Sequence, residues 1–254
     1  MITAKQYSEL SELVKRYKSL SKSEPNLKRY SQYAITYHST AIEGSTLTEH
    51  EVLDLLDMGK PAKNREFVYN LMVFDHDNAL KFVLEEAKNK TPITETLIKE
   101  ISARVMKNTG GEYKTPLGKF DSSKGDYRLI GVYAGRKTFP DYKKVPKLMK
   151  EFVEFIKAEQ AKKEINVFSL AVEVHYRFVS IHPFVDGNGR VARLLMNYIL
   201  AFYGFPALMV FKRDKIKYID TLYKAQETDD IAAFYDFMFR QYMKFLKSEI
   251  KRFE

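Results

Sequence analysis

Cysteine is absent from this sequence of 254 residues, so neither a disulfide framework nor a thiolate zinc site is expected. Long hydrophobic runs are also missing. Asn197, Gly204 and Pro206 interrupt the most apolar stretch, which is too short to span a bilayer. The first residues contain no apolar segment of the kind that a signal peptide needs. These absences predict a cytoplasmic protein without a membrane partner.

Glycine and proline are scarce, with 11 and 8 residues, and most of the chain repeats apolar residues at the spacing of an α-helix. Thr48 followed by Glu51 predicts a capped helix start, and Thr94 predicts another. Hydrophobic residues make up 45% of the chain, which is enough for a buried core. Helices are expected over residues 2–20, 27–43, 49–59, 67–88, 95–109, 146–156, 166–180, 191–203, 214–225 and 229–248.

Residues 111–142 differ from the rest of the chain, since glycine and proline recur there and interrupt the helical spacing. Alternating residues from Tyr127 to Tyr133, followed by a turn at Gly135, predict a β-hairpin at about residues 127–140. No other strand is predicted. The expected fold class is therefore all-α with one β-hairpin.

One glycine-rich turn concentrates the chemistry of this sequence. It reads His-Pro-Phe-Val-Asp-Gly-Asn-Gly-Arg from His182 to Arg190, and Arg193 follows three residues later. The apolar helical pattern of residues 191–203 comes directly after it, so the turn opens a helix. Backbone N–H groups at a helix N-terminus have no partner within the helix, and the helix dipole is positive there. The turn is therefore predicted to bind an anion, most simply a phosphate.

Four side chains around this turn each have an ordinary structural explanation, but together they indicate phosphate chemistry. Arg190 and Arg193 are about one helical turn apart and carry forked donors that fit phosphate oxygens. Asp186 supplies the hard oxygen ligand that Mg²⁺ prefers. His182 is the group here that can take a proton near neutral pH.

The net charge of +9 raises the question of a nucleic-acid partner. The basic residues are spread along the chain between apolar ones, and no nucleic-acid-binding motif is present. This pattern is typical of solvated helix faces, with a mild bias toward an anionic nucleotide such as ATP. We therefore expect no nucleic-acid partner.

Residues His182 to Arg193 resemble the motif of the Fic domain family, His-Pro-Phe-x-Asp/Glu-Gly-Asn-Gly-Arg-x-x-Arg, at every defined position. A match of this length is far more specific than a short glycine fingerprint. The resemblance implies a Fic-type helical core over residues 91–254, with the hairpin as its flap. It also implies an N-terminal helical region over residues 1–90. Most members of this family transfer AMP from ATP to a protein hydroxyl.

In that family the motif histidine accepts the proton of the target hydroxyl, which implies this role for His182. The freed oxygen attacks the α-phosphorus of ATP, and diphosphate leaves. The resemblance implies that Asp186 holds Mg²⁺. It places Arg190 on the β-phosphate and Arg193 on the γ-phosphate, where negative charge grows. The backbone of three motif residues would hold the phosphates: Gly187, Asn188 and Gly189.

The resemblance also places residues around the nucleotide. The hairpin falls where the family has its flap, although without the motif a plain surface hairpin would be preferred. The flap residues expected over the nucleotide are Val132, Tyr133, Ala134 and Gly135. Tyr218 and Ile219 lie where the family often has an aromatic residue near the adenine, and a core tyrosine is an equal alternative. Gln226 stands where many relatives have asparagine, which leaves its contact with the base or ribose open.

The segment from Ser39 to Gly44 matches the inhibitory pattern of the family, Ser/Thr-x-x-x-Glu-Gly/Asn. In members with this pattern before the core, the glutamate pairs with the second motif arginine. The implied pair here is Glu43 with Arg193, and the carboxylate takes the space that the γ-phosphate needs. Six residues are a weak signal alone, but the full motif downstream gives the pattern weight.

The leading hypothesis is therefore an autoinhibited protein adenylyltransferase that uses ATP and Mg²⁺. Its acceptor is a Tyr, Thr or Ser hydroxyl of a target protein or of the chain itself. Two alternatives stay open. The same site could remove AMP or transfer another phosphate-bearing group, or the chain could be a basic helical binding module without turnover. The oligomeric state is not predicted.

Overall fold

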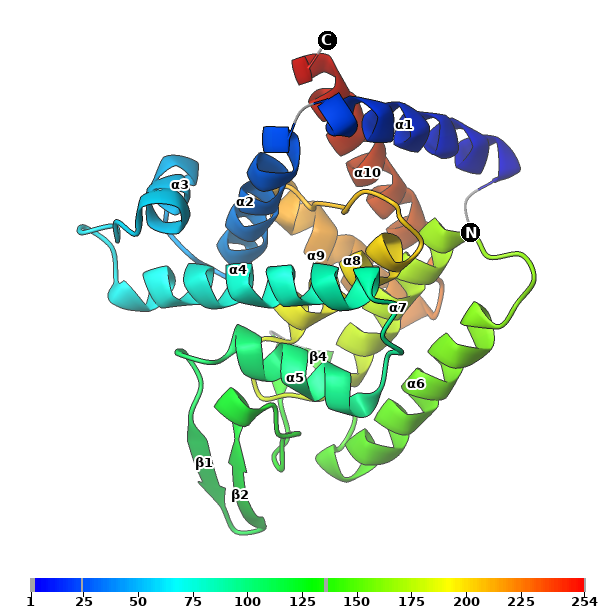
Figure 1. The fold of residues 1–254 in the computed structure, drawn as a ribbon. Helices are drawn as coiled ribbons and strands as arrows, with labels where there is room; N and C mark the ends of the chain where they lie inside the picture. The colour runs from blue at the N-terminus through cyan, green and yellow to red at the C-terminus, as the bar shows by residue number, and fades with distance from the viewer. Residues whose placement is uncertain (1–2, 24, 135–136, 254) are drawn as a thin grey trace.

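The computed structural model describes residues 3–23, 25–134 and 137–253, and Figure 1 shows that helices dominate the molecule. The all-α fold class predicted from the sequence is confirmed. The helices of these ranges are α1 (Ala4–Ser23), α2 (Pro25–Ile42), α3 (Glu49–Met58), α4 (Phe67–Lys88), α5 (Glu95–Val105), α6 (Val145–Gln160), α7 (Val167–Ile181), α8 (Asn188–Phe202), α9 (Lys215–Thr228) and α10 (Ala232–Phe253). Short 3₁₀ helices are η1 (Ser122–Lys124), η2 (Tyr142–Lys144) and η3 (Lys212–Asp214).

Two small antiparallel hairpins, rather than the one predicted, interrupt the helices in the described residues. The expected hairpin is present but short, with β3 (Tyr133–Ala134) paired to β4 (Lys137–Thr138). The second hairpin, β1 (Glu112–Thr115) with β2 (Gly118–Asp121), projects beneath α5 in Figure 1. Each of its strands has four residues, which is too short for a clear alternating pattern. The rings of Tyr113 and Phe120 stack across the two strands, with their centroids 4.9 Å apart, and this contact stabilises the hairpin.

Helix α8 lies at the centre of the fold and carries the second half of the motif. Almost every residue from Asn188 to Leu200 is buried, and α8 packs against α7 on one side and α4 on the other. Helix α7 is buried to a similar degree because its sequence is nearly all apolar. The turn between α7 and α8 therefore joins the two most deeply packed helices, which makes it a rigid platform.

Helix α2 brings the N-terminal region to that platform. Ile35 and Ile42 of α2 belong to the same hydrophobic core as Leu194 and Leu195 of α8. Helix α2 ends at Ile42, and Gly44 follows with a φ of 109°, a conformation that favours glycine. The predicted capping box at Thr48 then starts α3. The last turn of α2 is thereby fixed beside the motif.

The same packing continues at the ends of the chain, where α1 lies across α10 at the top of Figure 1. Leu10 and Val14 of α1 are buried in the common core. No helix in the described residues combines the length and apolar composition that a membrane crossing would need.

Candidate active site

His182 ends α7 in the left-handed conformation, with φ 54° and ψ 59°, which is uncommon for a residue other than glycine. Its ring stacks on Phe139, with the ring centroids 3.8 Å apart. Burial is the main cause that lowers the pKa of His182 to about 4, so the imidazole is neutral at pH 7. When Nδ1 donates to the Val179 carbonyl, 3.3 Å away, Nε2 carries the lone pair that can accept a proton.

The turn after His182 is held open for an anion. Gly187 precedes α8 with a φ of 77°, and among the described residues no side chain caps this helix start. The Asn188 amide locks the turn by accepting from the Phe184 N–H at 3.0 Å and donating to the Phe184 carbonyl at 2.9 Å. The side chain of Asn188 is thus structural. The first N–H groups of α8 keep their positive potential for a ligand.

Arg190 and Asp186 lie close together at this turn, one buried and the other exposed. The Arg190 side chain is buried, its Nη1 lies 3.4 Å from the Val105 carbonyl, and its Nε has no partner among the described residues. Asp186 is 62% exposed, with Oδ2 3.4 Å from Arg190 Nη2 and Oδ1 accepting from the Gly187 N–H. Its exposed carboxylate suits Mg²⁺, which is commonly held by one or two carboxylates together with substrate phosphates. The described residues contain no group of three or more metal-ligating side chains.

Arg193 is buried and makes contacts with all three of its guanidinium nitrogens. Nη2 pairs with Glu43 Oε1 at 2.6 Å and also donates to the Ser39 carbonyl at 2.9 Å. Nε donates to Ser39 Oγ at 2.9 Å, and Nη1 lies 3.5 Å from the Tyr218 hydroxyl. The last turn of α2 thus holds the second motif arginine through both residues of the inhibitory pattern.

The Glu43 carboxylate lies directly on the start of α8. A Cβ added to Gly189 would collide with Glu43 Oε1, so the carboxylate as placed here depends on a glycine at this position. Burial raises the pKa of Glu43, but the charges of Arg193 and Arg190 outweigh it and hold that pKa below its usual value. Glu43 is therefore an anion in the place where the helix N-terminus would bind one.

A cavity of about 150 Å³ lies between these groups. Its lining includes Glu43, His182, Arg193, Ile219 and Gln226. Ligand pockets usually enclose about 300–1,000 Å³, so this one is too small for a complete nucleoside triphosphate. The Glu43 side chain takes up part of the space at the arginine end.

A family model described as the Fic/DOC family matches residues 92–200. The chain carries a Fic domain. The match extends from α5 through most of α8. It therefore includes both hairpins and the complete turn from His182 to Arg190.

Curated relatives and solved structures agree with this assignment. The protein adenylyltransferase Fic of Drosophila grimshawi is 30% identical over 203 residues, which are 80% of this chain and 40% of that protein. The chain therefore spans about two fifths of the length of such relatives. A Fic domain containing signaling protein from Bacteroides thetaiotaomicron is 27% identical with a TM-score of 0.82, covering 96% of this chain and 97% of the other. Fic-1 from C. elegans is 26% identical with a TM-score of 0.82, covering 98% and 72%.

Two of the residues expected near the adenine, Tyr218 and Gln226, are held by contacts within the protein. Tyr218 is only 2% exposed, and its hydroxyl lies 2.8 Å from His175 Nε2, so it is a core tyrosine with one edge on the cavity. Gln226 donates from Nε2 to Ser180 Oγ at 2.9 Å. Its Oε1 is buried and has no partner among the described residues. Gln226 thus offers a ligand one unused acceptor.

Two of the residues expected in the flap lie away from the cavity at His182. Val132 and Tyr133 do not line the cavity, and Tyr133 is 79% exposed at the start of β3. Ala134 ends β3, and Gly135 lies outside the described residues. Phe139, after β4, faces the cavity instead and covers the His182 ring.

Arg128 is a site residue that sequence reasoning missed. It is 1% exposed, and its guanidinium donates only to backbone carbonyls: His182 at 2.8 Å, Ile130 at 2.8 Å and Pro140 at 2.6 Å. Its own N–H donates to the Pro183 carbonyl at 3.0 Å. Arg128 therefore ties both ends of the flap to the left-handed backbone of His182 and acts as a positioning residue.

Replacing Arg128 with lysine should lower the rate of any reaction that uses His182 by about ten- to a hundredfold, because an ammonium cannot bond all three carbonyls in one plane. The affinity for ATP should change little, since the Arg128 guanidinium bonds backbone carbonyls and does not line the cavity at His182. The measurements are kcat and, separately, ATP binding by calorimetry. Arg104→Lys, at a half-exposed arginine of α5, is the matched control. An unchanged kcat in Arg128→Lys would contradict the positioning role.

Buried histidines make the stability of this Fic protein sensitive to acid. Burial lowers the pKa of His175 to about 3 and that of His182 to about 4, and it lowers the pKa of His76 as well. An unfolded histidine has a pKa of about 6.5, so the unfolded chain binds more protons between pH 6.5 and 4. Stability is complete above pH 6.5 and falls as the pH drops through that window.

We expect the melting temperature to fall steadily from pH 6.5 to 4, with each such histidine contributing about 1.4 kcal/mol per pH unit. Scanning calorimetry at fixed ionic strength measures this slope. His175→Gln should melt lower at pH 7 but show a shallower slope below pH 6.5. A melting temperature that stays constant between pH 6.5 and 4 would contradict the expectation.

Proposed function

We propose that this chain is a protein adenylyltransferase, which transfers AMP from ATP to a Tyr, Thr or Ser hydroxyl of a protein. The observation that carries the proposal is the neutral imidazole of His182 beside the N-terminus of α8, together with two buried arginines of the same helix. A base for a hydroxyl and a site for polyphosphate are thus adjacent. Relatives named protein adenylyltransferase Fic support the same activity.

The chemistry follows from these positions. The acceptor O–H gives its proton to His182 Nε2 as its oxygen attacks the α-phosphorus of ATP. The bond from that phosphorus to the bridging oxygen breaks, and diphosphate leaves with the electron pair. Arg190, Arg193 and the N–H groups of α8 stabilise the charge that develops on the leaving group. When bound, Mg²⁺ would neutralise part of the same charge, and Asp186 is the residue that would hold it.

We propose further that Glu43 inhibits this reaction. Its carboxylate lies against Gly189 and pairs with Arg193, so a γ-phosphate at Arg193 would meet a like charge. The triphosphate then has to bend away from the in-line geometry that transfer requires. This role rests on the ion pair and on the small volume of the cavity.

Two labelled forms of ATP test the proposal. The Glu43→Gly chain is incubated with Mg²⁺ and ATP that carries ³²P on either the α- or the γ-phosphate. AMP transfer labels protein from the α-position alone, whereas phosphate transfer labels it from the γ-position alone. Labelling from neither position, with ATP binding intact, would remove the proposed activity.

A further inference from the structure

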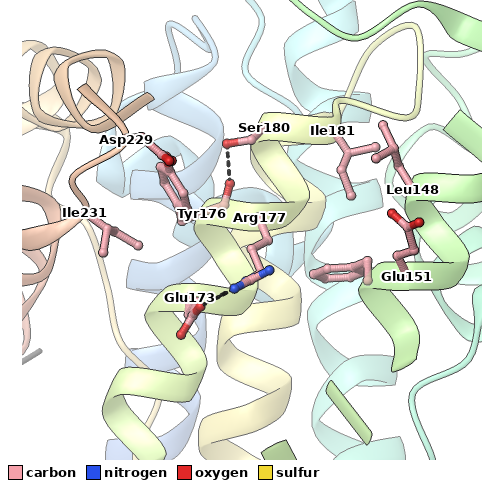
Figure 2. Close-up of a pocket in the computed structure, with 10 residues that line it drawn as sticks. Leu148, Glu151, Glu173, Tyr176, Arg177, Ser180, Ile181, Asp229 and Ile231 are labelled. Atoms are coloured by element: carbon pink, nitrogen blue, oxygen red, sulfur yellow. Dashed lines mark hydrogen bonds and ion pairs between the residues drawn. The ribbon is translucent and has the colours of Figure 1, made fainter. Parts of the chain in front are cut away.

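A groove of about 470 Å³ runs beside the active site, between α6, α7 and the junction of α9 with α10. One face of α7 forms its floor, because Glu173, Tyr176, Arg177 and Ser180 recur at helical spacing. Figure 2 shows Leu148 and Glu151 of α6 on one side of this floor and Asp229 and Ile231 on the other. We call this feature the acidic groove, after Glu151, Glu173 and Asp229.

The acidic groove is continuous with the active site. A second cavity, of about 450 Å³, shares Tyr176, Ser180 and Asp229 with the groove. The same cavity shares Phe139 and Gln226 with the cavity at His182. Thr138 at the end of β4, together with Phe139 and Pro140, also lines this second cavity. A chain segment whose hydroxyl reaches His182 can therefore pass the flap and enter the groove.

The charges of the groove are predominantly negative on a chain whose net charge is +9. Its single lining cation, Arg177, is already engaged, since it donates to Glu173 Oε1 from Nε at 2.9 Å and from Nη2 at 2.7 Å. The guanidinium also lies 3.9 Å from the ring centre of Phe155. Glu151 is 58% exposed, and the Asp229 residue is exposed as well. Glu151 Oε1 lies 3.8 Å from Lys147 Nζ, but a pair this exposed contributes little, so both carboxylates can still attract a cation.

Apolar side chains complete the lining and restrict the class of occupant further. Leu148, Phe152 and Ile231 lie beside the carboxylates. A lysine or arginine combines an aliphatic stem with a cationic end, which matches this mixture. The triphosphate of ATP does not match it, because the triphosphate is negatively charged and neither Arg190 nor Arg193 lines the groove.

We propose that the acidic groove binds a lysine- or arginine-bearing segment of the acceptor protein, next to the hydroxyl that is modified. This inference rests on the proposed adenylyltransferase function. Exposed charge pairs contribute little individually, so the groove selects among acceptors and does not by itself hold one tightly. Acceptor hydroxyls with basic neighbours are then modified in preference to those with acidic neighbours.

Binding of three fluorescent peptides tests the groove without requiring catalysis. Each is about ten residues long with one tyrosine, and its flanks are basic, neutral or acidic. Fluorescence anisotropy should show that the basic peptide binds most tightly, with the difference reduced in high salt. Glu151→Lys should weaken the basic peptide about five- to tenfold, and Asp229→Asn about two- to fivefold. Asparagine tolerates the left-handed conformation that residue 229 adopts.

The matched control is Glu154→Lys, which makes the same charge change on α6 outside the groove, at a glutamate that is 60% exposed. It should leave the affinity for the basic peptide close to that of the wild type. The groove proposal is overturned if the peptides bind equally, if none binds, or if Glu154→Lys weakens binding as much as Glu151→Lys.

Transfer of α-³²P label to the same peptides, in the Glu43→Gly background, separates the two proposals. Binding that prefers basic flanks without any transfer would remove the adenylyltransferase proposal and keep the cationic specificity of the groove. Transfer that ignores the flanking charge would keep the enzyme and overturn the groove.

Discussion

Glu43→Gly is expected to raise AMP transfer, including self-labelling, by about a hundredfold. The carboxylate pairs with Arg193 at 2.6 Å and fills the space next to Gly189, so its removal frees both the guanidinium and the room for a γ-phosphate. A triphosphate misplaced by about 1 Å costs roughly 10²-fold in rate, which sets the size of the expected gain. The measurement is the initial rate of α-³²P incorporation at saturating ATP and Mg²⁺.

Two further variants show whether the ion pair itself is responsible. Glu43→Asp should lie between wild type and Glu43→Gly, because the shorter side chain reaches Arg193 poorly. Arg193→Ala should not release activity, since it removes the phosphate ligand together with the partner of the inhibitor. Equal transfer by wild type and Glu43→Gly would mean that the end of α2 has no regulatory role.

His182→Ala, made in the Glu43→Gly background, should reduce AMP transfer by about 10²–10⁴-fold, the usual contribution of a general base. The affinity for ATP should stay within a few fold, because the imidazole faces the acceptor hydroxyl and not the phosphates. Transfer rates and calorimetric ATP binding are measured on the same preparation. His50→Ala, at an exposed histidine of α3, is the matched control. Labelling that survives His182→Ala at the level of the control would assign the base to another group.

The helices could be predicted closely because their signals are local. Thr48, Thr94 and Asn166 all cap helices through their side chains, and each lies next to a run of apolar residues at helical spacing. The contact between Glu43 and Arg193 spans 150 residues, and only the combination of two motifs indicated it. Spacing alone would not have placed the end of α2 beside α8.

The features that escaped prediction depend on long-range packing. Arg128 contacts backbone carbonyls that lie 2, 12 and 54 residues away. Every residue has such a carbonyl, so the amino-acid sequence does not indicate which ones Arg128 contacts. Tyr218 could equally have been a ligand contact or a core residue, because its bond to His175 appears only when α7 and α9 pack together. The acidic groove joins residues from α6, α7 and the α9–α10 junction, and no single segment suggested it.

Ser39 gives the inhibitory helix a second, opposite effect. Its two contacts with Arg193 do not involve Glu43, so we expect them to keep the guanidinium ordered when Glu43 is replaced. An arginine side chain carries about 2 kcal/mol of rotamer entropy, and a free one would lose it on binding phosphate. If α2 blocks the site as proposed, it would therefore also preorganise it, and deleting α2 would not be equivalent to replacing one glutamate. An enzyme without α2 would gain access to ATP but would have to immobilise its arginine in every catalytic cycle.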